Sequence, residues 1–270
     1  MFVEGTESVA DNHQNVQSIS SVAAATTGGA AAASISSEPS NVLHQQRTVP
    51  PNERSNTSIL SNDHILLHLP ATWVPMERNM ISQMVELNVV TASVEYTEAR
   101  KLFQLANKTI HKIYRVQNPT LHWQYTMEKD FMYQLYAIQA HSSFMRYERF
   151  LYHGTKRSNV ENINAKGFDR SYSGAHATLY GKGSYFARDL SYSAHDNYSP
   201  VDTSSGHKFV YVARVLVGRC FCVGNPNMQH LPNQENGRPF DSAVDNVTEP
   251  TIFVIFRDTC AYPQYLYEFS

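Results

Sequence analysis

Residues 151–198 read LYHGTKRSNVENINAKGFDRSYSGAHATLYGKGSYFARDLSYSAHDNY, and the rest of the chain is organised around them. A His-Gly-Thr triplet ends an expected strand, and a Gly-Lys-Gly turn leads into Tyr185. Ser193 and Tyr198 follow shortly after it. Aromatic faces, hydroxyl groups and an exposed glycine backbone therefore lie within one short stretch, which suits a pocket for a flat ring that bears an amide.

The composition favours an intracellular protein of the cytoplasm or nucleus. The formal net charge is −2 and no basic run occurs, so the sequence gives no indication of nucleic-acid binding. The 3 cysteines leave one unpaired in any disulfide scheme, which is typical of a reducing compartment. The N-terminus does not resemble a signal peptide, and no apolar run approaches the ~20 residues that span a bilayer. The 12 histidines follow no metal-binding pattern, so we expect no metal.

Two regions differ in composition. Residues 1–65 are rich in Ser, Ala, Asn, Gln and Thr and hold almost no aromatic side chains, so they cannot bury enough surface to offset the entropy of ordering. We expect this segment to be a disordered tail. Residues 66–270 carry the apolar patterns of a folded domain.

Hydrophobic periodicity predicts an α+β domain, because two helices lie in its first half and strands far outnumber helices in its second half. We expect Ser158 to cap a helix that Gly167 ends, and Trp123, Met127, Phe131 and Leu135 to form the buried face of another helix. The expected strands are 84–90, 109–119, 150–155, 208–218, 251–258 and a last edge strand 261–269; the expected helices are 93–108, 121–140, 158–168 and a short one within 185–198.

The Gly-Lys-Gly turn at 181–183 is weak evidence for nucleotide binding when taken alone. A dinucleotide-binding fingerprint would need a glycine where the chain has Phe186, and a P-loop would need a hydroxyl residue where the chain has Gly183. The turn becomes stronger evidence for a nucleotide pocket because Ser184–Ala187 follow it directly and His153 precedes Tyr185 by 32 residues.

The fragments LYHGT (151–155) and YGKGSYFA (180–187), in this order, strongly resemble the poly(ADP-ribose) polymerase superfamily, whose catalytic domains cleave NAD. The resemblance covers roughly residues 67–270. It implies the split antiparallel β-sheet ADP-ribosyltransferase fold, which is diphtheria-toxin-like, with residues 66–270 as the catalytic domain. NAD would serve as co-substrate, and acceptor proteins, this chain itself among them, would be the partners, with no membrane and no direct nucleic-acid contact.

The resemblance also implies a role for individual residues. The backbone of Gly154 and the hydroxyl of Ser193 would bind the nicotinamide carboxamide, while Tyr185 and Tyr198 would sandwich the ring. His153 and Thr155 would hold the adenosine ribose, and Arg170 would lie beside the adenine. The residues expected to bind NAD are His153, Gly154, Thr155, Arg170, Tyr180, Tyr185, Ser193 and Tyr198; the catalytic signature is His153, Tyr185 and a third residue.

That third position falls on Ile252, where polymerising members of the family carry a glutamate. Isoleucine accepts neither a hydrogen bond nor a proton. Glu249 lies three residues before Ile252, beyond Pro250, so strand alternation directs its side chain to the opposite face. Asp258 lies six residues after Ile252, which is about 20 Å along a strand, so neither carboxylate can replace the glutamate. The pattern resembles the mono-ADP-ribosylating branch, particularly the members attached to macrodomains.

We therefore expect transfer of a single ADP-ribose to a glutamate or aspartate side chain, in which the acceptor's own charge assists the reaction. Two other functions stay open at this point. The chain would be a catalytically weak module that binds or scaffolds through an NAD pocket, or an NAD glycohydrolase.

Overall fold

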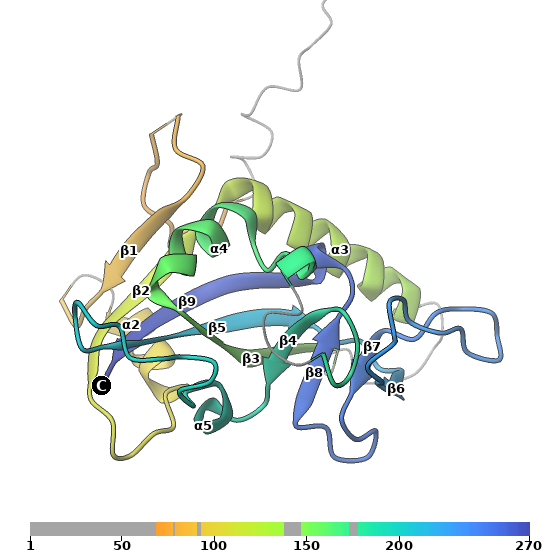
Figure 1. Cartoon of the computed structure of the whole chain (residues 1–270). Helices are drawn as coiled ribbons and strands as arrows, with labels where there is room; N and C mark the ends of the chain where they lie inside the picture. The colour runs from red at the N-terminus through yellow and green to blue at the C-terminus, as the bar shows by residue number, and fades with distance from the viewer. Residues whose placement is uncertain (1–68, 78, 91–92, 138–146, 173–177) are drawn as a thin grey trace, which may run out of the picture. The chain divides into compact units, whose positions relative to one another are not determined.

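The computed structural model describes residues 69–77, 79–90, 93–137, 147–172 and 178–270 (Figure 1). The predicted tail, residues 1–65, and its boundary at residue 66 lie outside these ranges. The elements are β1 (Gln83–Leu87), α2 (Ser93–Lys101), β2 (Ile110–Gln117), α3 (Pro119–Ala137), β3 (Glu148–Thr155), α4 (Val160–Lys166), β4 (Ser184–Ala187), α5 (Leu190–Ser193), β5 (Lys208–Leu216), β6 (Phe221–Val223), β7 (Ser242–Val244), β8 (Ile252–Ile255) and β9 (Ala261–Phe269).

The strands form one 9-stranded sheet in the order β1-β2-β9-β5-β3-β4-β8-β7-β6. All neighbouring strands run antiparallel except β6 and β7. β3 and β4 share only the pair Tyr152 and Ala187, whereas β3 and β5 pair along the whole of β3. The sheet therefore opens between β3 and β4, and the predicted α+β fold with a split antiparallel sheet is confirmed.

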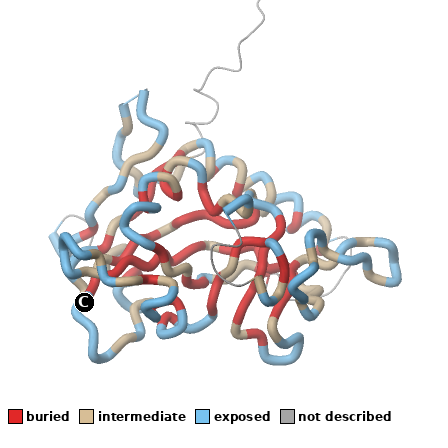
Figure 2. Tube along the Cα trace, viewed as in Figure 1, coloured by how far each residue is buried: buried red, intermediate tan, exposed pale blue. Residues whose placement is uncertain are grey.

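Strand β5 shows how the sheet separates two layers of core. Phe209 and Tyr211 pack with α3 and α4 on one face, and Val210 and Val212 pack with α2 and α5 on the other. This alternation is the period of two that any β-strand imposes on its side chains. Figure 2 shows that the residues along the central strands are mostly buried (red), as expected for a sheet that is covered on both faces.

Helix α4 ends at Gly167, as predicted. Its φ of 79° lies in the left-handed region, which glycine adopts without the steric cost that a Cβ brings. The prediction of Ser158 as the helix cap is wrong. Ser158 lies within a short 3-10 turn, Arg157–Asn159, and Asn159 occupies the cap position of α4 without a capping side-chain hydrogen bond.

The predicted buried face of α3 is also wrong. Trp123, Met127 and Phe131 are exposed, by 42%, 53% and 58%. The buried residues of the helix are instead the aromatic side chains of His122, Tyr125 and Tyr136, together with Met132. These tyrosines can be buried because their hydroxyls find partners: Tyr125 donates to Glu148 and Tyr136 to Asp241.

Other predictions also differ from the structure. Helix α2 ends at Lys101 rather than at residue 108. The short helix expected within 185–198 is confined to α5, Leu190–Ser193, because residues 185–187 belong to strand β4. Strand β9 lies between β2 and β5 and is not an edge strand. A proline is tolerated in this central strand because Pro263 lies where the register between β5 and β9 shifts, between Val212 and Ala213.

Candidate active site

A cavity of about 690 Å³ is lined by residues from both strands that flank the split, β3 and β4, and by α4, α5 and the start of β8. It collects all of the predicted site residues except Arg170. Those residues are His153, Gly154, Thr155, Tyr180, Tyr185, Ser193, Tyr198 and Ile252.

Gly154 lies at the tightest contact of this cavity. A Cβ atom added there would stand 2.1 Å from the carbonyl oxygen of Ser193 and 2.8 Å from the Cβ of Tyr198. No side chain fits in that space, so β3 approaches the end of α5 and the segment after it only through a glycine. The close approach brings the backbone of Gly154 next to Ser193 and Tyr198.

The orientation of His153 is set by a backbone group of the neighbouring strand. Its Nδ1 lies 2.9 Å from the carbonyl oxygen of Tyr185, which only accepts hydrogen bonds, so Nδ1 carries the hydrogen. In the neutral ring Nε2 is then the acceptor. Phe168 and Phe186 pack against the ring with centroids 5.0 Å and 5.7 Å away, which holds it in the cavity wall.

Two hydrogen bonds to its hydroxyl group fix the position of the Tyr185 side chain. The hydroxyl donates to the carbonyl oxygen of Gly181 at 2.8 Å and accepts from the backbone N–H of Tyr180 at 2.9 Å. The side chain thus closes the Gly-Lys-Gly turn from inside, and its ring becomes a rigid part of the wall. Burial raises the pKa of this phenol, so the hydroxyl keeps its proton.

Ser193 is the last residue of α5 and Tyr198 lies in the segment after it, and this stretch is bonded to the sheet at several points. The hydroxyl of Ser193 donates to the carbonyl oxygen of Tyr152 at 2.9 Å. Lys208 donates to Asp196 at 2.6 Å, and the hydroxyl of Ser199 accepts from the backbone N–H of Phe209 at 3.0 Å. These contacts make the segment a firm support for Tyr198.

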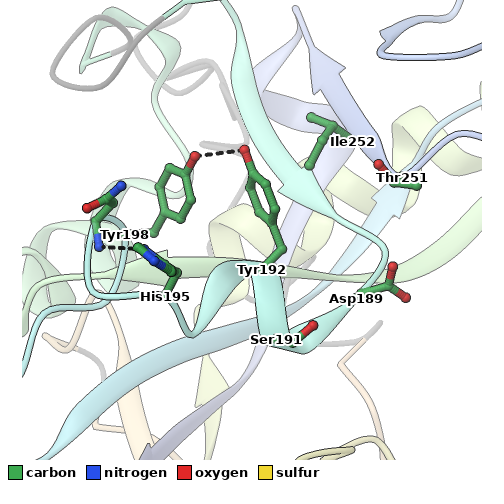
Figure 3. A pocket seen from close by; sticks show the side chains of 8 residues that line it. Asp189, Ser191, Tyr192, His195, Tyr198, Thr251 and Ile252 are labelled. Atoms are coloured by element: carbon green, nitrogen blue, oxygen red, sulfur yellow. Dashed lines mark hydrogen bonds between the residues drawn. The ribbon is translucent and has the colours of Figure 1, made fainter.

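Tyr192 was not predicted from the sequence and lies directly beside Tyr198. Their ring centroids are 4.9 Å apart at an angle of 23°, and their hydroxyls are 2.7 Å apart. Figure 3 shows the two rings side by side with their hydroxyl groups pointing at each other. Tyr192 therefore supports the orientation of Tyr198.

Thr155 and Arg170 have different positions. Thr155 is buried in β3 within the cavity wall, and its hydroxyl makes one long contact of 3.4 Å to the carbonyl oxygen of Lys156. Arg170 is not among the lining residues, although its neighbour Asp169 is. Its guanidinium donates to the carbonyl oxygen of Gln229 at 3.3 Å, so the structure does not bring it to the other site residues.

Ile252, the first residue of β8, is 5% exposed and lies in the cavity wall. Neither of the two acidic residues considered as replacements lines the cavity. The side chain of Glu249 is 82% exposed and lies 3.8 Å from Arg188, while Asp258 accepts from the backbone N–H of Arg170 at 3.2 Å.

A different carboxylate, Asp245, does line the cavity beside Ile252. Burial, the largest influence, raises the pKa of Asp245, but hydrogen bonds from Thr251 and Ile252 lower it, and the pKa ends below its usual range. Asp245 is therefore ionised at neutral pH. The pair Asp245-Asn246 directly follows β7 (Ser242–Val244) and is a signal that was available in the sequence. Asx residues at a strand end favour turns that bind their own backbone.

A second cavity of about 510 Å³ adjoins the first and is drawn in Figure 3. The two cavities share Tyr192, Tyr198, Thr251 and Ile252. The remaining walls of the second cavity are polar: Asp189, Ser191, His195 and Asn197.

Within the part of the chain that the structure describes, no three His, Cys, Asp or Glu side chains come together as a metal site would require. In the same ranges, no helix combines the length and the apolar character needed to cross a membrane.

Comparison with known proteins finds one matching family and several relatives. The sequence profile of the poly(ADP-ribose) polymerase catalytic domain matches residues 86–238, which is more than half of the chain and ends before Ile252. The human protein mono-ADP-ribosyltransferase PARP14 is 44% identical over 125 residues, which are 45% of this chain and 7% of that protein. Mouse PARP10, also called a protein mono-ADP-ribosyltransferase, is 46% identical over 121 residues, 44% of this chain and 12% of that protein.

Mouse protein mono-ADP-ribosyltransferase PARP11 is 34% identical over 140 residues, 45% of this chain and 42% of that protein. The chain thus spans less than half of each of these relatives. The profile match covers β3, α4, β4 and α5, which carry much of the cavity lining. The chain belongs to the poly(ADP-ribose) polymerase catalytic domain family.

Proposed function

We propose that this chain is an NAD-dependent protein mono-ADP-ribosyltransferase that transfers one ADP-ribose to a glutamate or aspartate side chain. The observation that carries the proposal is the single cavity lined by His153, Tyr185 and Ile252. The first two match the family's signature, and the third places an aliphatic side chain where elongation would need a carboxylate. The names of the relatives support the same activity.

NAD binds in the larger cavity with its nicotinamide near Gly154. The Gly154 backbone and the Ser193 hydroxyl bind the carboxamide, and the rings of Tyr185 and Tyr198 lie along the faces of the pyridinium, a favourable place for a cationic ring. The Ser193 hydroxyl already donates to Tyr152, so its lone pairs remain to accept from the carboxamide NH₂. His153 and Thr155 hold the adenosine ribose.

In the reaction, the bond between ribose C1 and the nicotinamide nitrogen breaks, and nicotinamide leaves as a neutral molecule with the bonding electron pair. Hydrogen bonds to its carboxamide favour departure. A carboxylate oxygen of the acceptor then forms the bond to C1 and neutralises its positive charge. An ionised carboxylate has no proton to lose, so no general base is needed, which is consistent with isoleucine at position 252.

The acceptor enters through the second cavity. Its shared wall of Tyr192, Tyr198, Thr251 and Ile252 places it next to the NAD cavity, and its polar remainder suits a peptide backbone and side chain. We also propose that residues 66–270 form the catalytic domain, that residues 1–65 are dispensable for it, and that the protein acts inside the cell.

The test is to incubate the purified chain with NAD and a mixture of proteins, and to measure nicotinamide release together with the intact masses of all proteins. A single ADP-ribose increment, on an acceptor or on the chain itself, supports the proposal. Free ADP-ribose without modified protein would instead indicate a glycohydrolase. Binding of NAD without nicotinamide release would indicate a binding or scaffolding module.

A further inference from the structure

We infer that Asp245 is a positioning residue for this reaction. It holds the wall that the two cavities share and thereby directs the ADP-ribosyl group to a protein acceptor instead of water. This inference rests on the proposed function. The structural claim that Asp245 holds the wall can also be tested without any enzymatic activity.

The contacts of Asp245 concentrate on the first residues of β8. Its Oδ1 accepts from the backbone N–H groups of Thr251 at 2.9 Å and Ile252 at 3.0 Å. Its Oδ2 accepts from the hydroxyl of Thr251. One carboxylate thus binds three donors of two consecutive residues, and both residues line both cavities.

Among the described residues, the other hydrogen bonds of the loop between β7 and β8 leave the amides of Thr251 and Ile252 without a second acceptor. The backbone N–H of Asp245 donates to the carbonyl oxygen of Ile252 at 3.4 Å, a bond that does not involve the Asp245 side chain. Asn246 Oδ1 accepts from the backbone N–H groups of Thr248 and Glu249 at 2.8 Å and 3.2 Å, and Pro250 has no N–H to donate. The carbonyl oxygen of Thr251 accepts from the backbone N–H of Arg188 at 2.8 Å. The amide donors that lead into β8 therefore depend on Asp245.

The position of Ile252 matters because its side chain is the apolar element at the boundary of the cavities. Once nicotinamide has left, ribose C1 reacts with whichever nucleophile is in place, and water is always a competitor. A well-placed isoleucine keeps water from this boundary. If Asp245 is lost, the N–H groups of Thr251 and Ile252 lose their acceptor, and the wall shifts towards water to replace it.

The mechanism depends on hydrogen-bond acceptance by Asp245 and not on its charge. Asparagine retains an oxygen for the two backbone N–H groups, and its NH₂ can donate to the Thr251 hydroxyl oxygen. Asp245→Asn should therefore behave like the wild type, whereas Asp245→Ala should not. Asp202→Ala is the matched control: Asp202 likewise binds a hydroxyl and a backbone N–H of its own loop, at Ser204 and Ser205, but lines neither cavity.

The experiment measures nicotinamide release and protein-bound ADP-ribose in the same reaction and takes the ratio of hydrolysis to transfer. We expect Asp245→Ala to raise this ratio by about tenfold, within the range that a small misplacement near reacting atoms produces. Asp245→Asn and Asp202→Ala should leave the ratio of hydrolysis to transfer within about twofold of the wild-type value. General destabilisation would reduce both products together and would not change the ratio.

Hydrogen exchange of the backbone N–H groups tests the structural part of the inference and does not require enzymatic activity. The N–H groups of Thr251 and Ile252 should exchange faster in Asp245→Ala and at the wild-type rate in Asp245→Asn. Unchanged exchange in Asp245→Ala, an unchanged ratio, or equal effects of the two Asp245 substitutions would overturn the inference. If the wild-type chain releases no nicotinamide, the proposed function is wrong, and so is the proposed partition of ADP-ribose between acceptor and water. The exchange rates would still decide whether Asp245 holds Thr251 and Ile252 in place.

Discussion

The carbonyl oxygen of Ser193 lies 2.1 Å from the place where a side chain on residue 154 would begin. The two residues belong to β3 and to the end of α5, and they meet where the nicotinamide is proposed to bind. The glycine is therefore required by the protein's own packing as well as by any ligand.

Replacing Gly154 by valine should abolish binding of inhibitors that mimic nicotinamide, because β3 and the α5 segment must separate to admit the side chain. Titration calorimetry with such an inhibitor measures the effect. Gly206→Ala is a control for general destabilisation, since it has a φ of 73° and open space around it and lines neither cavity. Normal inhibitor binding by Gly154→Val would show that the nicotinamide site lies elsewhere.

Replacing Tyr198 by alanine should weaken the same inhibitors by about 1–2 kcal/mol, because one aromatic face beside the ring is lost. Tyr198→Phe keeps that face and removes only the hydroxyl that pairs with Tyr192, so it should retain most of the affinity. Dissociation constants of the three proteins decide the matter. Equal loss in both variants would mean that the hydroxyl pair, and not the ring face, determines binding.

His122 should make the free energy of unfolding depend on pH. Burial, and next the nearby Arg214 guanidinium, lowers the pKa of His122 to about 4 from 6.5. The folded protein thus binds this proton less readily than the unfolded chain, so stability is highest above pH 6.5 and falls as the pH drops from 6.5 to 4. We expect a loss of roughly 1–2 kcal/mol over this window, allowing for partial solvent screening.

The variant that tests this is His122→Phe, which keeps a ring against Trp73 and Tyr262 but does not titrate. Urea unfolding between pH 4 and 7 should show a shallower pH dependence for the variant than for the wild type. Parallel curves for the two proteins would rule out His122 as the source.

Ile252 should limit the product to one ADP-ribose per site. Elongation needs a ribose hydroxyl to lose its proton and to be aimed at C1, and an aliphatic side chain does neither. Denaturing gels and intact masses should show a single increment and no ladder. A ladder that a chain-specific glycohydrolase collapses would contradict this prediction.

Ile252→Glu should not create a polymerase and should lower activity. The side chain at this position packs with Ala243 and Val254, where a carboxylate would be poorly hydrated, and its charge would compete with that of the acceptor. Ile252→Val is the conservative control and should retain single transfer. Polymer formed by Ile252→Glu would show that the third residue alone decides between the two products.

Several features were determined by the sequence itself because their cause is local. The alternation in β5 follows from the pleat, and the end of α4 at Gly167 follows from the one residue that adopts a φ of 79° without strain. The motifs at 151–155 and 180–187 identified the family and most of the cavity residues, since they consist of consecutive residues whose order is visible in one dimension.

Only the tertiary structure decided which faces and which distant residues meet. Periodicity predicted helix α3 but not its buried side, because Tyr125 and Tyr136 are buried only where Glu148 and Asp241 accept their hydroxyls. The central place of β9 comes from its pairing with β2 on one side and β5 on the other, which a local pattern does not contain. Tyr192 and Asp245 reached the candidate site for the same physical reason: hydrogen bonds and stacking act over a few ångströms, and the pairing of strands and loops sets those distances.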